Sequence, residues 1–220
     1  MARRKILKVP QPIGFVLIAD GKTEQWYVEL LKKYYDLRIK FLPELSCHSI
    51  SKQYELVKSS IDKGYEHVFW IIDFDNVQKE NNEAKIENSV LQQFERLYSK
   101  AIKNQQWKSR LTVIVNNPCL EYWFYLHQHP DSNKYFAKYE NDLLPVLRDF
   151  VVGGGLFDRY NKTKQDYLKA PGLFVRLLPY LQKIDFNRLR AFDFQTCQNE
   201  SVSEMYKLFT ALNIDVNVDG

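Results

Sequence analysis

Short apolar runs alternate with amphipathic stretches through the first half of the chain. Four runs have the length and composition of buried strands, and they span residues 14–19, 39–42, 67–73 and 111–115. The run at 67–73 (HVFWIID) is apolar at nearly every position, which is typical of a central strand in a parallel sheet. After the first run, apolar residues recur at helical spacing, at Trp26, Leu30, Leu31 and Tyr34.

Strands that alternate with helices imply right-handed βαβ crossovers, because that connection packs each helix back onto the sheet. We therefore predict an α/β fold with a mostly parallel central sheet flanked by helices. After Pro118 the pattern indicates helices only, at 120–128, 141–150, 162–169, 173–183 and 203–212. Three successive glycines, Gly153 to Gly155, interrupt this part. Residues 1–150 are thus expected to form an α/β domain, and residues 151–220 a helical C-terminal extension packed on it.

The composition is that of an ordinary globular protein, with 45% hydrophobic and 26% charged residues among 220. The longest apolar run, Val68 to Ile72, is far shorter than the roughly 20 residues of a membrane-spanning helix. No apolar stretch of a signal peptide follows the basic N-terminus. These features predict a cytoplasmic protein without a membrane partner. The three cysteines form no C-x-x-C pair, so neither disulfides nor a structural zinc are expected.

Polar motifs follow three of the predicted strands. They are Asp20 to Glu24 (DGKTE), Asp73 to Asn76 (DFDN) and Asn116 to Pro118 (NNP). Because the carboxyl ends of parallel strands meet at one edge of a sheet, where ligands bind, we expect these motifs to lie close together.

Asp73 and Asp75 carry the predicted metal site. If the chain is still extended there, the two side chains point to the same side. At about 4 Å and an effective dielectric constant near 20, two carboxylates repel by about 4 kcal/mol. A cation relieves this repulsion, and carboxylate oxygens are the ligands that Mg²⁺ or Mn²⁺ prefers. Asp20, after the neighbouring strand, would complete the site.

Three further residues have two interpretations each, and a fourth, Asn117, has one. Glu24 and Glu121 either orient a metal or a water, or they favour the positive N-terminal end of a helix. Lys22 either contacts a phosphate or is a solvated loop lysine. Asn117 is expected to cap a helix that begins at Pro118.

The chain resembles the RloB-like family in three ordered blocks. They span residues 16–27 (VLIADGKTEQWY), 71–76 (IIDFDN) and 116–127 (NNPCLEYWFYLH). The resemblance covers the first 130 residues. It implies a Toprim-like fold, akin to the metal-binding domain of topoisomerases, primases and OLD-type nucleases, and an origin beside bacterial restriction and phage-defence genes.

Carried over residue by residue, the resemblance makes Asp20, Asp73 and Asp75 the acidic cluster that binds Mg²⁺ or Mn²⁺. The family usually has E-G-x-T-E where this chain begins with Asp20. Aspartate is one methylene shorter than glutamate, so its reach as a general acid or base is reduced, whereas metal ligation remains feasible.

The net charge of +4 is unevenly distributed. Residues 159–190 contain eight Lys or Arg against Asp166 and Asp185. This segment is either a footprint for nucleic acid or a solvated helical surface. The candidate nucleic-acid-binding residues are Lys22, Lys162, Lys164, Lys169, Arg176, Arg188 and Arg190.

These features together predict a metal-dependent nuclease that acts on DNA or RNA in a bacterial defence system, with a possible partner protein from that system. Asp73 and Asp75 would bind the metal, Asp20 would serve as ligand or base, and Glu24 and Glu121 would assist catalysis. One alternative is a catalytically weak or inactive nucleic-acid-binding or regulatory subunit. Another, less favoured, is a phosphohydrolase of the haloacid-dehalogenase type, whose D-x-D motif would have to end the first strand.

Overall fold

A five-stranded sheet lies at the centre of the computed structural model, which describes residues 14–19, 21–42, 49–83, 89–147 and 173–216. Its strand order is β2-β1-β3-β4-β5. The parallel strands are β1 (Phe15–Ala19), β2 (Ile39–Leu42), β3 (His67–Asp73) and β4 (Leu111–Asn117). β5 (Val202–Ser203) pairs with β4 in the antiparallel direction. The predicted α/β class with a mostly parallel sheet is confirmed.

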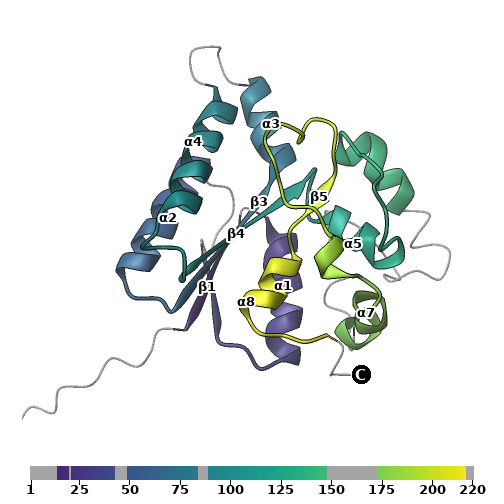
Figure 1. Cartoon of the computed structure of the whole chain (residues 1–220), viewed down its shortest axis with the longest axis horizontal. Helices are drawn as coiled ribbons and strands as arrows, with labels where there is room; N and C mark the ends of the chain where they lie inside the picture. The colour runs from purple at the N-terminus through teal and green to yellow at the C-terminus, as the bar shows by residue number, and fades with distance from the viewer. Residues whose placement is uncertain (1–13, 20, 43–48, 84–88, 148–172, 217–220) are drawn as a thin grey trace, which may run out of the picture.

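Helices cover both faces of the sheet (Figure 1). One face carries α1 (Lys22–Tyr34), α5 (Glu121–Gln128), α7 (Leu173–Leu181) and α8 (Tyr206–Ala211). The other carries α2 (Ile50–Asp62), α3 (Phe74–Glu83) and α4 (Val90–Lys103). Shorter elements are the π-helix η1 (Tyr139–Leu143), which continues as α-helix over residues 144–147, and the 3-10 helix η3 (Phe186–Arg188).

The alternation of side chains along β3 explains its unbroken apolar run. Phe69 and Ile71 pack into the core beneath α1 and α5, whereas Val68, Trp70 and Ile72 pack beneath α2 and α4. A strand in the middle of a sheet covered on both faces buries both sets of side chains. The placement of β3 as a central strand was thus readable from its sequence.

Polar contacts fix the helices on the second face. Trp70 Nε1 donates to Gln53 Oε1 of α2 over 2.9 Å inside the core. Ser89 caps α4, since its hydroxyl accepts from Gln92 N. Gly64 follows α2 with a φ of +85°, a backbone conformation that glycine adopts without strain.

The segment after β3 differs from the prediction of an extended chain. α3 begins at Phe74, directly after the strand, so Asp75 lies in the first turn of a helix. The reason is packing, because Phe74 and Val77 share one helical face and are buried in the core that contains Phe94 of α4. The prediction that Asp73 and Asp75 belong to one extended segment is wrong.

The C-terminal part is also not purely helical. Residue 203, where we expected a helix to begin, lies in β5 together with residue 202, and α8 starts at Tyr206. Glu204 explains the strand, since its backbone N–H donates to Val115 O and its carboxylate accepts from Val115 N. The C-terminal extension thus adds a strand to the sheet.

Part of the predicted organisation falls on residues outside the described ranges. The glycine break at 153–155 and the helix expected at 162–169 lie there, so the division at residue 150 stays a prediction. The helix expected at 173–183 is confirmed as α7.

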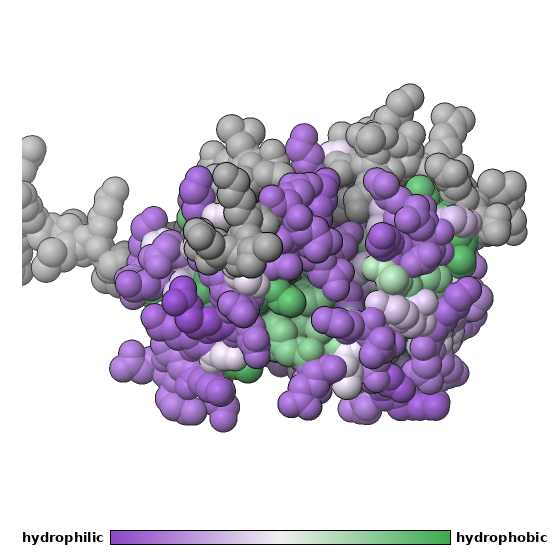
Figure 2. Space-filling model, turned by 90° about the horizontal axis from the view of Figure 1, so that it is seen from above, coloured by the Kyte–Doolittle hydropathy of each residue, from purple (hydrophilic) through white to green (hydrophobic). Residues whose placement is uncertain are grey.

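No helix in the described ranges is long and apolar enough to cross a bilayer. On the side where α3 lies in Figure 1, hydrophilic residues surround a smaller hydrophobic area (Figure 2).

Candidate functional site at the carboxyl edge of the sheet

The candidate site lies where the strand order reverses. From β1 the chain moves to β2 on one side, and it later returns to form β3 on the other side of β1. In open parallel sheets, ligands bind in the crevice outside the carboxyl ends of two strands related in this way. Asp73 is the last residue of β3 and is paired in register with Asn116 of β4. The topology therefore places Asp73 at the position where this class of sheet binds its ligands.

Asp73 connects the end of β3 to the start of α5. Its side chain is 8% exposed, and Oδ1 accepts a hydrogen bond from Leu120 N over 3.0 Å. The backbone N–H groups at the start of a helix lack partners within the helix and favour a negative charge nearby. The carboxylate of Asp73 therefore stabilises the start of α5, whatever else it binds.

Asp75 is half-buried and lies next to the loop that follows β4. Its backbone N–H donates to Pro118 O over 2.9 Å, which joins the start of α3 to the cis Asn117–Pro118 segment. The D-x-D motif and the N-N-P motif are thus brought together, as the sequence predicted.

Asn117 has a different role from the one expected. α5 begins at Glu121 with Leu120 as its N-cap, so Asn117 does not cap a helix that starts at Pro118. Instead, the Asn117 Nδ2 group donates to Cys197 O over 2.6 Å and to Glu200 O over 2.7 Å. Asn117 therefore attaches the segment before β5 to the end of β4.

Glu24 and Glu121 are both buried, with 2% and 0% of their surface exposed. Each lies in the first turn of its helix, α1 or α5. An acidic residue in the first turn interacts favourably with the helix dipole, so stabilisation of the helix start is sufficient to explain the positions of Glu24 and Glu121. Their burial beside the ends of β1 and β4 is equally compatible with a role in the site.

Gly21, the N-cap of α1, lies directly against the carboxylate of Glu24. A Cβ atom on residue 21 would collide with Glu24 Oε2 and would lie 2.9 Å from Glu24 Cδ. Because Glu24 is buried, its carboxylate has little room to move aside. Glycine at position 21 is thus required by the way the Glu24 side chain folds over the start of α1.

We expect Gly21→Ala to lower the free energy of unfolding by about 1–3 kcal/mol, because it overpacks this buried contact. The measurement is urea denaturation of the wild type, Gly21→Ala, Glu24→Ala and the double variant. In the double variant the collision is removed, so the two changes should cost less than the sum of the single ones. Strict additivity would show that the contact between Gly21 and Glu24 has no energetic weight.

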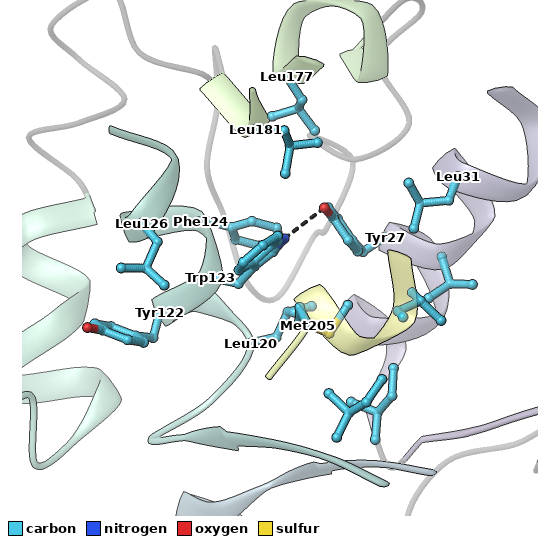
Figure 3. Packing of buried hydrophobic residues seen from close by; sticks show 14 of the residues in the cluster. Tyr27, Leu31, Leu120, Tyr122, Trp123, Phe124, Leu126, Leu177, Leu181 and Met205 are labelled. Carbon is cyan, nitrogen blue, oxygen red and sulfur yellow. Dashed lines mark hydrogen bonds between the residues drawn. The ribbon is translucent and has the colours of Figure 1, made fainter. Parts of the chain in front are cut away.

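A buried hydrogen bond joins α1 and α5, the helices that carry Glu24 and Glu121 (Figure 3). Trp123 Nε1 of α5 donates to Tyr27 OH of α1 over 2.7 Å. Both rings are fully buried, and burial raises the pKa of Tyr27 well above its usual value. Leu177 and Leu181 of α7 pack in the same cluster. Contacts in the core thus hold α1 and α5 in position relative to each other.

The described residues leave the predicted three-carboxylate site incomplete. Within ranges 14–19, 21–42, 49–83, 89–147 and 173–216, no three His, Cys, Asp or Glu side chains are grouped so that they could hold a metal ion. Asp20 lies outside these ranges. A shared metal site of Asp20, Asp73 and Asp75 therefore stays a prediction.

The model of the family described as RloB-like protein matches residues 15–212, from the first strand to the last helix. The chain belongs to the RloB-like family. Comparison with curated proteins gave no match, and neither did comparison with solved structures. The family match extends well beyond the three motifs, since it includes β5 and α8 of this RloB-like chain.

The candidate basic residues of the RloB-like chain are distributed over several places. Arg188 and Arg190 line one pocket of about 230 Å³. Lys22 is exposed at the first position of α1, and Arg176 is exposed on α7. The remaining three, Lys162, Lys164 and Lys169, lie outside the described residues.

Asn116 is a polar residue of the RloB-like chain to which the sequence assigned no role. It is fully buried beside Asp73, and its Oδ1 accepts from Ser203 Oγ over 2.7 Å. Its Nδ2 group is buried and has no hydrogen-bond partner among the described residues. Buried donors of this kind are rare in native proteins and often mark a place for a water or a ligand. In the sequence, the signal that could have pointed to Asn116 was a polar residue at the end of an apolar strand.

Proposed function

We propose that this RloB-like chain is a metal-dependent nuclease that cleaves phosphodiester bonds of DNA or RNA in a bacterial defence system. The observation that carries the proposal is the nearly buried carboxylate of Asp73 at the reversal point of a parallel sheet. A charged group is costly to bury, so a carboxylate kept in this position is a candidate for function. The Toprim-like character of the fold forms part of the same proposal.

The donor set suits a hard divalent cation. Asp73 and Asp75 would hold Mg²⁺ or Mn²⁺ together with Asp20, because carboxylate oxygens are the preferred ligands of both ions. When bound, the ion supplies positive charge that polarises a phosphoryl oxygen and lowers the pKa of a water.

The chain itself supports binding of a phosphate at this edge. α1, α3 and α5 each begin at the carboxyl end of a strand or in the loop that follows it, so the N-terminal ends of all three helices lie at this edge. Such ends favour anions because their first N–H groups lack partners within the helix. Glu24 and Glu121, buried in two of these first turns, are the candidates to orient a water or accept a proton.

The second candidate function is a nucleic-acid-binding or regulatory subunit that cleaves weakly or not at all. It is favoured by Asp20, which stands where the family usually has a glutamate and has a shorter reach. In that case binding of nucleic acid would persist without cleavage.

Purified protein should cleave at least one of single-stranded DNA, double-stranded DNA and RNA in the presence of Mn²⁺ or Mg²⁺. The same reaction with excess EDTA should leave the substrate intact, because the cation supplies the charge that stabilises the transition state. Product analysis on denaturing gels measures both reactions. Cleavage that is equally fast in EDTA would contradict the metal-dependent mechanism, and nucleic-acid binding without cleavage would support the second candidate.

A further inference from the structure

A polar pocket of about 230 Å³ lies between α5 and β5, beside the candidate site. Its wall contains two arginines, two aromatic or aliphatic residues of α5 and two serines, namely Arg188, Arg190, Tyr122, Leu126, Ser132 and Ser203. Pockets that bind drug-sized molecules have volumes of roughly 300–1,000 Å³. This one is smaller, so it has room for part of a nucleotide but not for a base pair.

Both arginines are held at the pocket by ion pairs that an anionic ligand can replace. Arg188 is 3.0 Å from Asp131, and their side chains are 71% and 73% exposed. Arg190 is 3.0 Å from Glu200, with exposures of 51% and 31%. Ion pairs in contact with solvent stabilise a protein little, because water screens them. A guanidinium group fits a phosphate with two parallel hydrogen bonds, so a phosphate can take the place of these solvent-exposed carboxylates.

Two buried residues of α5 form the inner side of the pocket. Tyr122 is 2% exposed, and its hydroxyl donates to Ser132 O over 3.3 Å. Burial raises the pKa of Tyr122 to about 12, and the positive charge of Arg190 opposes that rise. Leu126 of α5 continues this inner side. Because both residues are only 2% exposed, they close the pocket from below, and the arginines supply the contacts to a ligand.

The pocket is connected to Asp73 through the ends of neighbouring strands. Ser203 is paired with Asn116, and Asn116 is paired with Asp73. Two strand spacings separate Ser203 from Asp73, which is roughly 10 Å. The buried Nδ2 donor of Asn116, without a partner among the described residues, lies between the two positions. A chain that crosses this edge from Asp73 thus reaches the pocket within a short distance.

We propose that this pocket is a subsite for single-stranded nucleic acid, in which Arg188 and Arg190 bind a backbone phosphate near the one positioned at Asp73. The identity of the ligand rests on the proposed function. A single strand is the fitting ligand because its phosphates and sugars can bend into a concave site, whereas paired bases exceed the volume available.

The test is fluorescence anisotropy with a short labelled oligothymidylate and a short labelled oligouridylate, in EDTA and over a range of salt concentrations. The double variant Arg188→Ala/Arg190→Ala should bind at least one of them on the order of tenfold more weakly than the wild type. The slope of log affinity against log salt should become shallower by about 0.7, the contribution of one neutralised single-strand phosphate, since both arginines bind the same phosphate.

The matched control is Arg96→Ala/Lys103→Ala, which removes the same charge from exposed positions of α4 on the other face of the sheet. It should retain the wild-type slope and affinity within about twofold, as expected for charges remote from the ligand. Arg188→Lys/Arg190→Lys keeps the charge and loses the two-pronged geometry, so it should keep the slope but bind more weakly. This variant serves in place of the alanine variant if the latter shows an altered circular dichroism spectrum.

Two results would overturn the subsite. They are equal binding by the arginine variants and the α4 control, and absence of binding by the wild type to both oligonucleotides. Because EDTA prevents metal-dependent cleavage, this test is separate from the nuclease assay. Weaker binding by the arginine variant together with an inactive wild type would leave the subsite standing and refute the nuclease.

Discussion

Asp73→Asn is expected to abolish metal-dependent cleavage while the fold remains intact. Asparagine has one neutral oxygen where aspartate has a charged carboxylate, so the proposed metal would lose a ligand at the reversal point of the sheet. Loss of the several kcal/mol that a metal contributes to the transition state corresponds to a fall in rate on the order of 10³-fold. Titration calorimetry with Mn²⁺ should show binding at least about tenfold weaker, since even residues that only support a ligand have effects of that size.

The fold should survive this substitution because the hydrogen bond between Asp73 and the start of α5 needs only an acceptor at residue 73. Its Oδ1 accepts from Leu120 N, and the amide oxygen of asparagine can accept the same hydrogen bond. The free energy of unfolding should therefore change by less than about 1 kcal/mol. Asp62→Asn is the matched control, as Asp62 is an exposed aspartate at the end of α2, on the opposite edge of the sheet. Wild-type Mn²⁺ affinity in Asp73→Asn would show that Asp73 is only a cap for α5.

Glu204→Ala is expected to have the largest effect on stability, a loss of about 3–5 kcal/mol in the free energy of unfolding. Glu204 is fully buried. Its carboxylate accepts from Val115 N over 3.0 Å and from Phe192 N over 2.9 Å, and it pairs with Lys207 over 2.7 Å. Alanine would leave two buried N–H donors without an acceptor and a partly buried ammonium group without its counter-charge. Urea denaturation measures the effect.

Two variants separate the charge of Glu204 from its hydrogen bonds. Glu204→Gln keeps one acceptor oxygen but directs an amide N–H₂ at a backbone donor, so it should also be destabilised by at least about 1 kcal/mol. Glu55→Ala removes an exposed glutamate of α2 and should change stability by no more than about 0.5 kcal/mol. If Glu204→Ala were as stable as Glu55→Ala, the attachment of β5 to β4 would not depend on this carboxylate.

The sequence by itself determined the central part of the fold. The apolar runs at 15–19 and 67–73 and the amphipathic stretches between strands are local patterns, and they predicted the four parallel strands with their helices. They also placed Asp73 at the end of a central strand. Such features are readable because burial on both faces of a sheet imposes its pattern on consecutive residues.

Tertiary structure decided how the motifs are arranged at the edge of the sheet. α3 begins at Phe74 because Phe74 and Val77 bury against α4, and Asn117 binds carbonyl groups of Cys197 and Glu200 instead of capping a helix. β5 is two residues long, and its place beside β4 depends on the contacts of Glu204 with distant backbone groups. These features rest on partners remote in sequence, and a short segment has no periodic pattern of its own by which such partners could be recognised.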